Sequence, residues 1–248
     1  MKKNIRKAMF KNEFDKILKY SGIKRAFGYS FYFKNYIFEG IDLKNKKLLD
    51  LGGGNGIASF YAYHVEKSCK CTIVDPYEDG SHTLMNLQYE KLSNLYDKAV
   101  TLHNDYIDTL PESNTFDIIL MHNSVNHIGE DIIADMETNQ KSQIEYLTRL
   151  GKIMDRAKKG ATIIVADCSS KNLWNDLNIK NILAPTIEWN LHKPPSVWQK
   201  MLEDLGCEHV STKWAARREL LFFGKFLFSN RLVSYMTNSS FISIYKKI

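Results

Sequence analysis

The sequence of 248 residues predicts an α/β fold in which helices cover both faces of a seven-stranded, mostly parallel sheet. Three observations support this prediction. Short apolar segments rich in β-branched residues alternate with segments of helical periodicity, which favours parallel strands joined by right-handed crossovers. A glycine-rich turn directly follows the first strand. Two late strands lack a full strand–helix repeat, which indicates an antiparallel last strand at the sheet edge.

The first 45 residues are expected to form an N-terminal cap, with a main domain at 46–248. Residues 1–20 place apolar side chains at helical spacing between lysines, which predicts an amphipathic helix. Residues 27–38 (FGYSFYFKNYIF) hold seven aromatic side chains. This stretch either forms a lid over a bound ligand or packs against the main domain.

Strand and helix patterns alternate through the main domain. Strands are predicted at 46–52, 71–75, 99–105, 116–121, 161–167, 207–214 and 241–247. Helices are predicted at 57–67, 83–96, 144–157 and 196–205. The third helix is expected to end in Lys158, Lys159 and Gly160, which suit a helix C-terminus.

The net charge of +6 is concentrated at the start of the chain, where the first twenty residues hold seven Lys or Arg and two acidic residues. A nucleic-acid-binding surface usually spreads its basic side chains over a broad face, so this distribution argues only weakly for a nucleic-acid partner, although the basic N-terminal helix leaves an RNA substrate open. The N-terminus lacks the features of a signal peptide, and no 18-residue apolar window is present. A cytoplasmic protein is therefore expected.

The cysteines are Cys69, Cys71, Cys168 and Cys207. They lack the paired spacing of a zinc site and are expected to be reduced, structural thiols. No cluster of carboxylates and amides stands out at metal-binding spacing, so no metal is expected.

The stretch LLDLGGGNG at the end of the first strand is the strongest motif. A dinucleotide fingerprint G-x-G-x-x-G that began at Gly52 would need a third glycine at position 57, which is Ile57. The spacing is instead D-x-G-x-G-x-G, from Asp50 to Gly56. With acidic residues closing the second and third strands, the sequence from about 46 to 247 resembles the class I S-adenosylmethionine-dependent methyltransferases.

The resemblance implies a Rossmann-like fold with S-adenosylmethionine as the cofactor. The backbone of Gly52, Gly53 and Gly54 would approach the amino-acid end of the cofactor, and Asp50 would orient the turn or reach the ammonium group. Ligands of open parallel sheets bind at the carboxyl ends of the strands, where all these residues lie.

The resemblance also assigns the other end of the cofactor. Asp75 would accept hydrogen bonds from both ribose hydroxyls, and Asp105 would accept one from the adenine amine, with Tyr106 against the ring. His122 and Asn123 would lie beside the methionine moiety. Asp75 could instead cap a helix, and Asp105 could make only a turn.

Methyl transfer needs a base when the acceptor is a hydroxyl or a protonated amine, and histidine suits that role near neutral pH. His127 and His192 are the candidates, because both follow strand ends that border the expected crevice. Against this role, a lone histidine is more often a hydrogen-bonded structural residue. Glu188 and Trp189 share the second loop and are expected to shape the acceptor pocket.

The acceptor is expected to be a small molecule. The Asn-Pro-Pro-aromatic signature of methyltransferases that act on base amino groups is absent, since the sequence reads HNSV from His122. Residues 185–207 resemble small-molecule methyltransferases of bacterial surface-polysaccharide and secondary-metabolite pathways. The expectation is O-methylation of a hydroxyl, including that of a sugar. N-methylation of a small amine and a non-catalytic cofactor-binding subunit are the alternatives.

Residues 219–236 (ELLFFGKFLFSNRLVSYM) are apolar but carry Lys225 and Arg231. They are too short and too charged to cross a bilayer. With the basic residues 1–20, they could touch a membrane surface or a lipid-linked substrate. They could also pack on the domain or form the contact of a homodimer.

Overall fold

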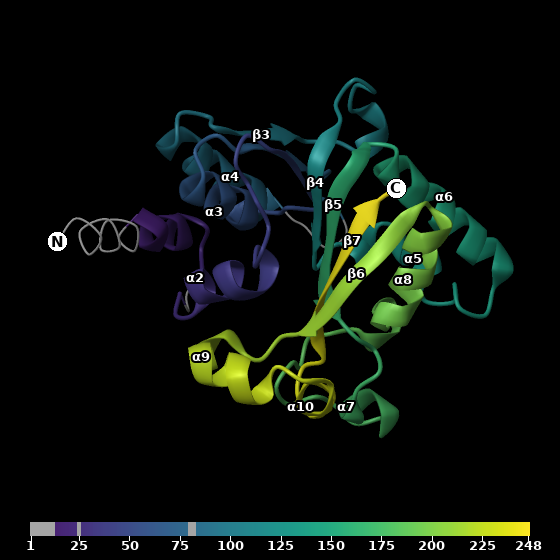
Figure 1. Cartoon of the computed structure of the whole chain (residues 1–248). Coiled ribbons are helices and arrows are strands. Elements are labelled where there is room, and N and C mark those ends of the chain that lie inside the picture. Colours follow the sequence, from purple (N-terminus) through teal and green to yellow (C-terminus); the bar gives the residue numbers. More distant parts are fainter. Residues whose placement is uncertain (1–12, 24–25, 79–82) are drawn as a thin grey trace.

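The computed structural model describes residues 13–23, 26–78 and 83–248, which contain a seven-stranded sheet in the order β3-β2-β1-β4-β5-β7-β6 (Figure 1). Strands β1 to β5 pair in parallel, and β7 runs antiparallel to its neighbours β5 and β6. This arrangement confirms the predicted fold class, including the antiparallel last strand. The strands are β1 (Lys47–Leu51), β2 (Lys70–Val74), β3 (Val100–His103), β4 (Phe116–His122), β5 (Ala157–Cys168), β6 (Cys207–Trp214) and β7 (Ser240–Lys247).

Helices cover both faces of the sheet, with α3 (Ile57–Val65) and α4 (Thr83–Leu95) on one side and α6 (Gln140–Met154) and α8 (Pro195–Asp204) on the other (Figure 1). Two apolar cores result. Leu48 of β1 belongs to the core with α3 and α4, whereas Leu49 belongs to the core with α6 and α8. Successive side chains of a strand point to opposite faces, so both faces of this strand are buried.

The sequence indicated that the antiparallel strand lies at the sheet edge, and this prediction was wrong. β7 lies between β5 and β6, and β6 forms the edge. Because β6 is antiparallel to β7, it runs in the same direction as the five parallel strands. The last strand in the sequence, β7, therefore inserts between β5 and β6. The local sequence pattern does not encode this position.

The predicted end of the helix at 144–157 was wrong. The helix α6 ends at Met154, and residues 157–160 belong to β5. Ala157 pairs with Phe116, the register then shifts, and Gly160 adopts a left-handed φ of 78°. Lys158 reaches Asp117 at 2.7 Å instead of helix carbonyls. Pairing with β4 therefore ends the helix earlier than its charge pattern predicted.

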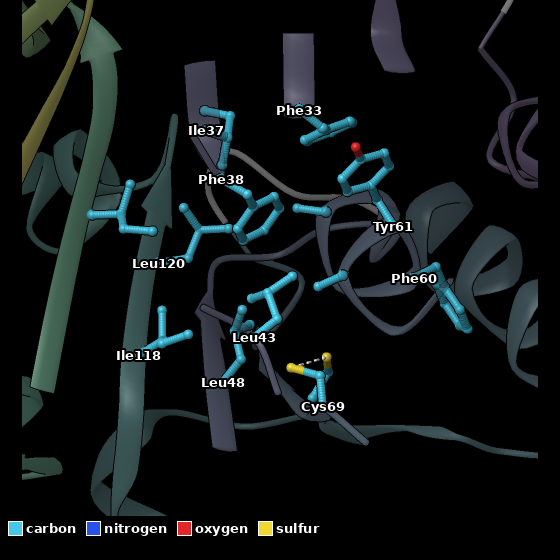
Figure 2. Packing of buried hydrophobic residues seen from close by; sticks show 14 of the residues in the cluster. Phe33, Ile37, Phe38, Leu43, Leu48, Phe60, Tyr61, Cys69, Ile118 and Leu120 are labelled. Atoms are coloured by element: carbon cyan, nitrogen blue, oxygen red, sulfur yellow. Dashed lines mark hydrogen bonds between the residues drawn. The ribbon is translucent and has the colours of Figure 1, made fainter. Parts of the chain in front are cut away.

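The aromatic N-terminal stretch packs against α3. Helix α2 (Tyr29–Tyr32) continues into a π-helical turn, η1 (Phe33–Ile37). The Phe33 ring stacks on Tyr61 of α3 with 5.1 Å between ring centroids, and the Phe38 ring lies 5.9 Å from the same tyrosine (Figure 2).

Residues 13–20 are helical, in agreement with the described part of the predicted amphipathic helix. Phe14, Ile17 and Leu18 are buried in the same core as Phe33 and α3. The remainder of that predicted helix, residues 1–12, lies outside the described residues. The described N-terminal residues therefore share a core with the sheet.

Residues 218–236 form short turns of helix at one end of the sheet, and the last of these turns contacts α7 (Leu173–Asp176) (Figure 1). These are η5 (Arg218–Leu220), α9 (Leu221–Phe223), η6 (Gly224–Phe228) and α10 (Arg231–Met236). Gly224 and Ser234 are buried, whereas most large apolar side chains of the segment are exposed. Within the described part of the chain, no helix combines the length and apolar character needed to cross a membrane.

The remaining helical elements lie in connecting segments, between β3 and β4, between β4 and α6, and between α7 and α8. They are η2 (Ile107–Thr109), η3 (Val125–His127), α5 (Glu130–Ile133) and η4 (Trp189–Leu191).

Candidate functional site

A cavity of about 680 Å³ opens where the chain leaves β1, β2 and β4. We call it the glycine cavity. Eight of the residues predicted from the sequence to form a site line it: Gly52, Gly53, Gly54, Asp75, Tyr106, His122, Asn123 and His127. Asp50, Asp105 and His192 are not part of its wall.

The glycine turn is constrained by the protein itself. Gly52 has a left-handed φ of 61°, and a Cβ atom there would lie 2.6 Å from the Cβ of Ser124. A Cβ on Gly53 would lie 2.9 Å from the Asp50 carboxyl carbon. Side chains are therefore excluded on the inner side of the turn, which leaves its backbone at the cavity wall.

Asp75 ties this turn to the end of β2. Its carboxylate accepts hydrogen bonds from the N–H of Gly54 at 2.7 Å and from the N–H of Tyr77 at 2.8 Å. The Tyr77 hydroxyl donates to the carbonyl of Gly54 at 3.0 Å. A carboxylate offers about four acceptor positions, so this structural role is compatible with contact to a ligand.

Asp50 lies behind the turn, away from the cavity. It is buried and accepts a hydrogen bond from the Ser59 hydroxyl at 2.8 Å. Burial raises the pKa of this carboxyl to about 7, against the opposing effect of the Ser59 hydrogen bonds. The position suits orientation of the turn.

The two acidic positions after β3 differ in what they reach. Asp105 is exposed, and its carboxylate accepts a hydrogen bond from the N–H of Tyr106 at 2.7 Å. Asp108 lines the glycine cavity and pairs with Lys152 of α6 at 2.5 Å. The Tyr106 hydroxyl donates to Glu78 at 2.5 Å across the rim. The adenine contact of Asp105 stays a prediction.

Asn123 and Ser124 form the turn after β4. Asn123 has a left-handed φ of 53°, a conformation that asparagine tolerates better than most residues, and its N–H donates to the carbonyl of Ala166 at 2.7 Å. The Ser124 hydroxyl donates to the carbonyl of Leu51 at 2.5 Å. This serine faces Gly52, and no sequence signal marked it.

His122 at the end of β4 is held by the N-terminal segment. Its Nε2 atom lies 3.2 Å from the hydroxyl of Tyr32. Burial lowers the pKa of His122 to about 4, so the ring is neutral near neutral pH. Burial also raises the pKa of Tyr32 above its ordinary value, which keeps the hydroxyl protonated.

The two histidines predicted as bases lie in different surroundings. His127 is at the cavity wall, with Nδ1 bound to Glu130 and Nε2 lying 3.1 Å from the side-chain amide of Asn126. His192 is outside the wall, and its Nδ1 atom lies 2.9 Å from the buried carboxylate of Asp167. Donation from Nδ1–H to that carboxylate leaves Nε2 as the acceptor nitrogen of the neutral ring.

A second cavity of about 320 Å³ adjoins the first. We call it the side cavity. Tyr29, His122 and Asn123 line both cavities. Of the residues expected to shape an acceptor pocket, Glu188 and Trp189 line neither cavity, whereas the neighbouring Ile187 lines the side cavity.

The sequence missed several residues of the glycine cavity. Tyr29 comes from the aromatic stretch that was expected to contact either a ligand or the domain, and it does reach the wall. Arg149 and Lys152 also line the wall and come from α6, for which the sequence pattern indicates only an apolar face. Among the residues that the structure describes, no group of three His, Cys, Asp or Glu side chains could hold a metal ion.

Comparison by sequence finds no relative: no protein-family model and no curated protein matches this chain. Comparison by structure finds many. A methyltransferase of Haloferax volcanii, solved in complex with the Trm112 methyltransferase activator, matches with a TM-score of 0.60 and 13% identity over 95% of this chain and 96% of its own.

Two further matched structures are similar in fold. A SAM-dependent methyltransferase of Aquifex aeolicus has a TM-score of 0.54 and 18% identity over 85% of this chain and 86% of its own. The mitomycin 7-O-methyltransferase MmcR has a TM-score of 0.54 and 13% identity over 89% of this chain. This chain spans only 53% of the length of MmcR.

O-methyltransferases and an N-methyltransferase are both among the matched structures. At these identities the likeness concerns the fold. The chain has the class I methyltransferase fold, with the sheet order found here and an antiparallel β7.

Proposed function

We propose that this chain, which has the class I methyltransferase fold, is an S-adenosylmethionine-dependent methyltransferase of small molecules, with a hydroxyl as the preferred acceptor group. One observation carries the proposal. The glycine turn presents its backbone to the glycine cavity, and the turn is locked to Asp75 through the N–H of Gly54. The cavity volume of about 680 Å³ lies within the usual range for small-molecule sites.

The residues of the cavity fit the chemistry of S-adenosylmethionine. Its ammonium and carboxylate groups would meet backbone N–H and C=O groups of Gly52, Gly53 and Gly54. Asp75 would accept hydrogen bonds from the ribose hydroxyls, and Tyr106 would lie against the adenine ring. Tyr106 and Asp75 both line the cavity, which supports this assignment.

The cofactor would supply an electrophilic methyl group on a sulfonium. The chain would align the acceptor with that methyl group and accept the proton of the acceptor hydroxyl as the new bond forms. The neutral His122 suits a position near a sulfonium, because it adds no opposing positive charge. His127 and His192 remain the proposed bases, with His192 oriented by Asp167.

Transfer of a labelled methyl group tests the proposal. The full chain is incubated with methyl-labelled S-adenosylmethionine and fractionated small-molecule extracts, and label in an extract component is the expected result. Alkali-resistant label on an amine would identify the N-methyltransferase alternative. Cofactor binding without any turnover would favour the non-catalytic subunit. Full activity in a His127→Ala, His192→Ala double variant would remove both proposed bases.

Membrane contact is a second part of the proposal, and it concerns residues 1–20 and 219–236. It is supported by the exposed Phe222, Phe223 and Phe226, which are 69, 75 and 78% exposed. Large exposed apolar surfaces mark interaction sites. Contact between two copies of the chain through the same surface is the alternative. The division into a cap at 1–45 and a methyltransferase domain at 46–248 also belongs to the proposal.

A further inference from the structure

The side cavity has its own charged wall. Its lining includes Arg217, Arg218 and Glu219, which belong to the start of the segment between β6 and β7. Glu219 lies 3.6 Å from Arg217 and 3.3 Å from Arg218, so one carboxylate is shared by two guanidinium groups. These residues leave one net positive charge at the wall.

Arg218 is held in place by the N-terminal segment. Its guanidinium lies 4.2 Å from the centre of the Tyr29 ring, within the range of a cation–π interaction. A Cβ atom on Gly28 would lie 2.4 Å from the carbonyl oxygen of Arg218, so the two backbones are in close contact. The contact with the Tyr29 ring and the contact with the Gly28 backbone together fix the position of Arg218.

The hydrogen-bonding capacity of Arg218 is incompletely used. The Arg218 side chain is 29% exposed, and the carboxylate that its Nη2 atom meets at 3.3 Å is the shared one. Its Nε–H, which is buried behind the accessible part of the guanidinium, has no hydrogen-bond partner among the described residues. A guanidinium has five donors in a planar fork that matches carboxylate and phosphate groups. A charge with spare donors in a cavity wall is typical of anion recognition.

We propose that the side cavity binds the acceptor, and that the acceptor carries an anionic carboxylate or phosphate group that Arg218 recognises. This inference rests on the proposed function, because it treats the glycine cavity as the donor site. Tyr29, His122 and Asn123 form the wall common to both cavities. An acceptor anchored at Arg218 can therefore present its reacting group at that common wall.

Three matched probes test the inference by ligand-observed NMR. They are para-hydroxybenzoate, para-hydroxyphenyl phosphate and para-hydroxybenzamide, which share a ring and a hydroxyl and differ in charge. Each is titrated into the full chain saturated with S-adenosylhomocysteine. At least one anion is expected to bind about tenfold more tightly than the amide, because a charge-assisted hydrogen bond is worth that factor or more.

Variants identify the residue responsible. Arg218→Gln is expected to abolish the preference for the anion, and Arg218→Lys to retain part of it. Arg231→Gln removes an exposed arginine of α10 that lies outside the cavity wall, and it should leave the preference unchanged. The affinity for S-adenosylhomocysteine should stay the same in all three, which also verifies folding.

Equal binding of the amide and the anions, binding of no probe, or an anion preference that survives in Arg218→Gln would each overturn the inference. Failure of the wild-type chain to bind S-adenosylhomocysteine would contradict the proposed function instead. If the chain does not bind S-adenosylhomocysteine, the probe titration is repeated without it, because probe binding needs no turnover. Failure of the proposed function and failure of this inference are therefore distinguishable.

Discussion

Two constraints exclude a side chain at Gly52: its backbone conformation and the lack of space. Comparison with a second glycine separates their effects on stability. Its left-handed φ of 61° disfavours any side chain, and a Cβ atom would also collide with Ser124 at 2.6 Å. Gly40 has a similar φ of 76° but no atom within 4 Å of its potential Cβ. The pair therefore offers a matched comparison of strain alone with strain plus collision.

We expect Gly40→Ala to lower the free energy of unfolding by about 1 kcal/mol through backbone strain. Gly52→Ala should cost roughly 1–3 kcal/mol more, because the turn or Ser124 must move, and it should weaken binding of S-adenosylhomocysteine. Urea unfolding and calorimetric titration measure both effects. Equal costs at the two positions would show that the turn tolerates a side chain.

Asp50 predicts a pH dependence of stability. Burial raises the pKa of its carboxyl to about 7 in the folded state, from about 4 in the unfolded chain. The folded state therefore binds the proton more tightly, and the contribution of this group to stability is fully present below about pH 4 and is lost as the pH rises to about 7.

Replacing Asp50 by asparagine should remove that loss. Urea unfolding of Asp50→Asn between mildly acidic and neutral pH should show a flatter stability profile than the wild type, with higher relative stability at neutral pH. An unchanged slope would mean that this carboxyl ionises without penalty in the folded protein.

The sequence predicted which strand ends carry polar residues, but not which of those residues reach the cavity. Asp75 follows β2, His122 is the last residue of β4, and both line the cavity. Asp105 also follows a strand, yet the turn after it exposes its carboxylate and brings Asp108 to the wall. Side-chain direction in an irregular loop depends on tertiary contacts such as the Asp108–Lys152 pair, which no local pattern encodes.

The π-helical turn η1 packs the N-terminal stretch against α3. Phe33 is fully buried and stacks on Tyr61 of α3 (Figure 2). Phe33→Ala should lower the free energy of unfolding by roughly 3–5 kcal/mol, the usual cost of removing a buried aromatic ring. Phe27→Ala, at a position 62% exposed, is the matched control and should cost far less.

Urea unfolding of both variants tests this element. A single cooperative transition is expected in each, because the described N-terminal residues share a core with α3. A small effect of Phe33→Ala, or a separate early transition, would indicate that the N-terminal segment folds apart from the sheet.

The accuracy of the predicted ends varied for strands and helices alike, and β5 begins at Ala157, four residues before its predicted start at 161. β2 lies within one residue of its prediction at each end, because its β-branched run is short and bounded by polar residues. α6 ended three residues early, because Ala157 pairs with Phe116 of β4. A helix boundary set by pairing with a distant strand is not visible in the local sequence.

The exposed aromatic surface of Phe222, Phe223 and Phe226 is a feature of the whole molecule. Phe222 and Phe226 lie ring against ring with 6.4 Å between centroids and present a shared face. Aromatic side chains beside basic ones favour the interface of an anionic bilayer. The exposed Arg231 lies on the adjacent α10.

Flotation with vesicles of phosphatidylglycerol and phosphatidylcholine tests membrane contact. The wild-type chain should float with these vesicles, and the double variant Phe222→Ser, Phe226→Ser should not. Ile144→Ser removes another exposed apolar side chain, 57% exposed, from α6 and should float as the wild type does. Absence of flotation, together with a dimer that the double variant dissociates, would favour contact between two copies instead.

The order of the sheet was predictable only in part. The alternation of strands and helices indicates the parallel strands β1 to β5, because crossovers have one preferred hand. The place of β7 between β5 and β6 depends on a pairing across more than seventy residues, from Thr162 to Lys246. A strand at the sheet edge and a strand inserted between two others can have the same local sequence pattern.

Calorimetric titration of the full chain with S-adenosylmethionine and S-adenosylhomocysteine tests the central claim most directly. Both ligands should bind the wild type, and Asp75→Ala should weaken both by at least about tenfold through loss of charge-assisted hydrogen bonds. Asp204→Ala, an exposed carboxylate at the end of α8, should bind as the wild type does. Binding of neither ligand to the wild-type chain would contradict the account.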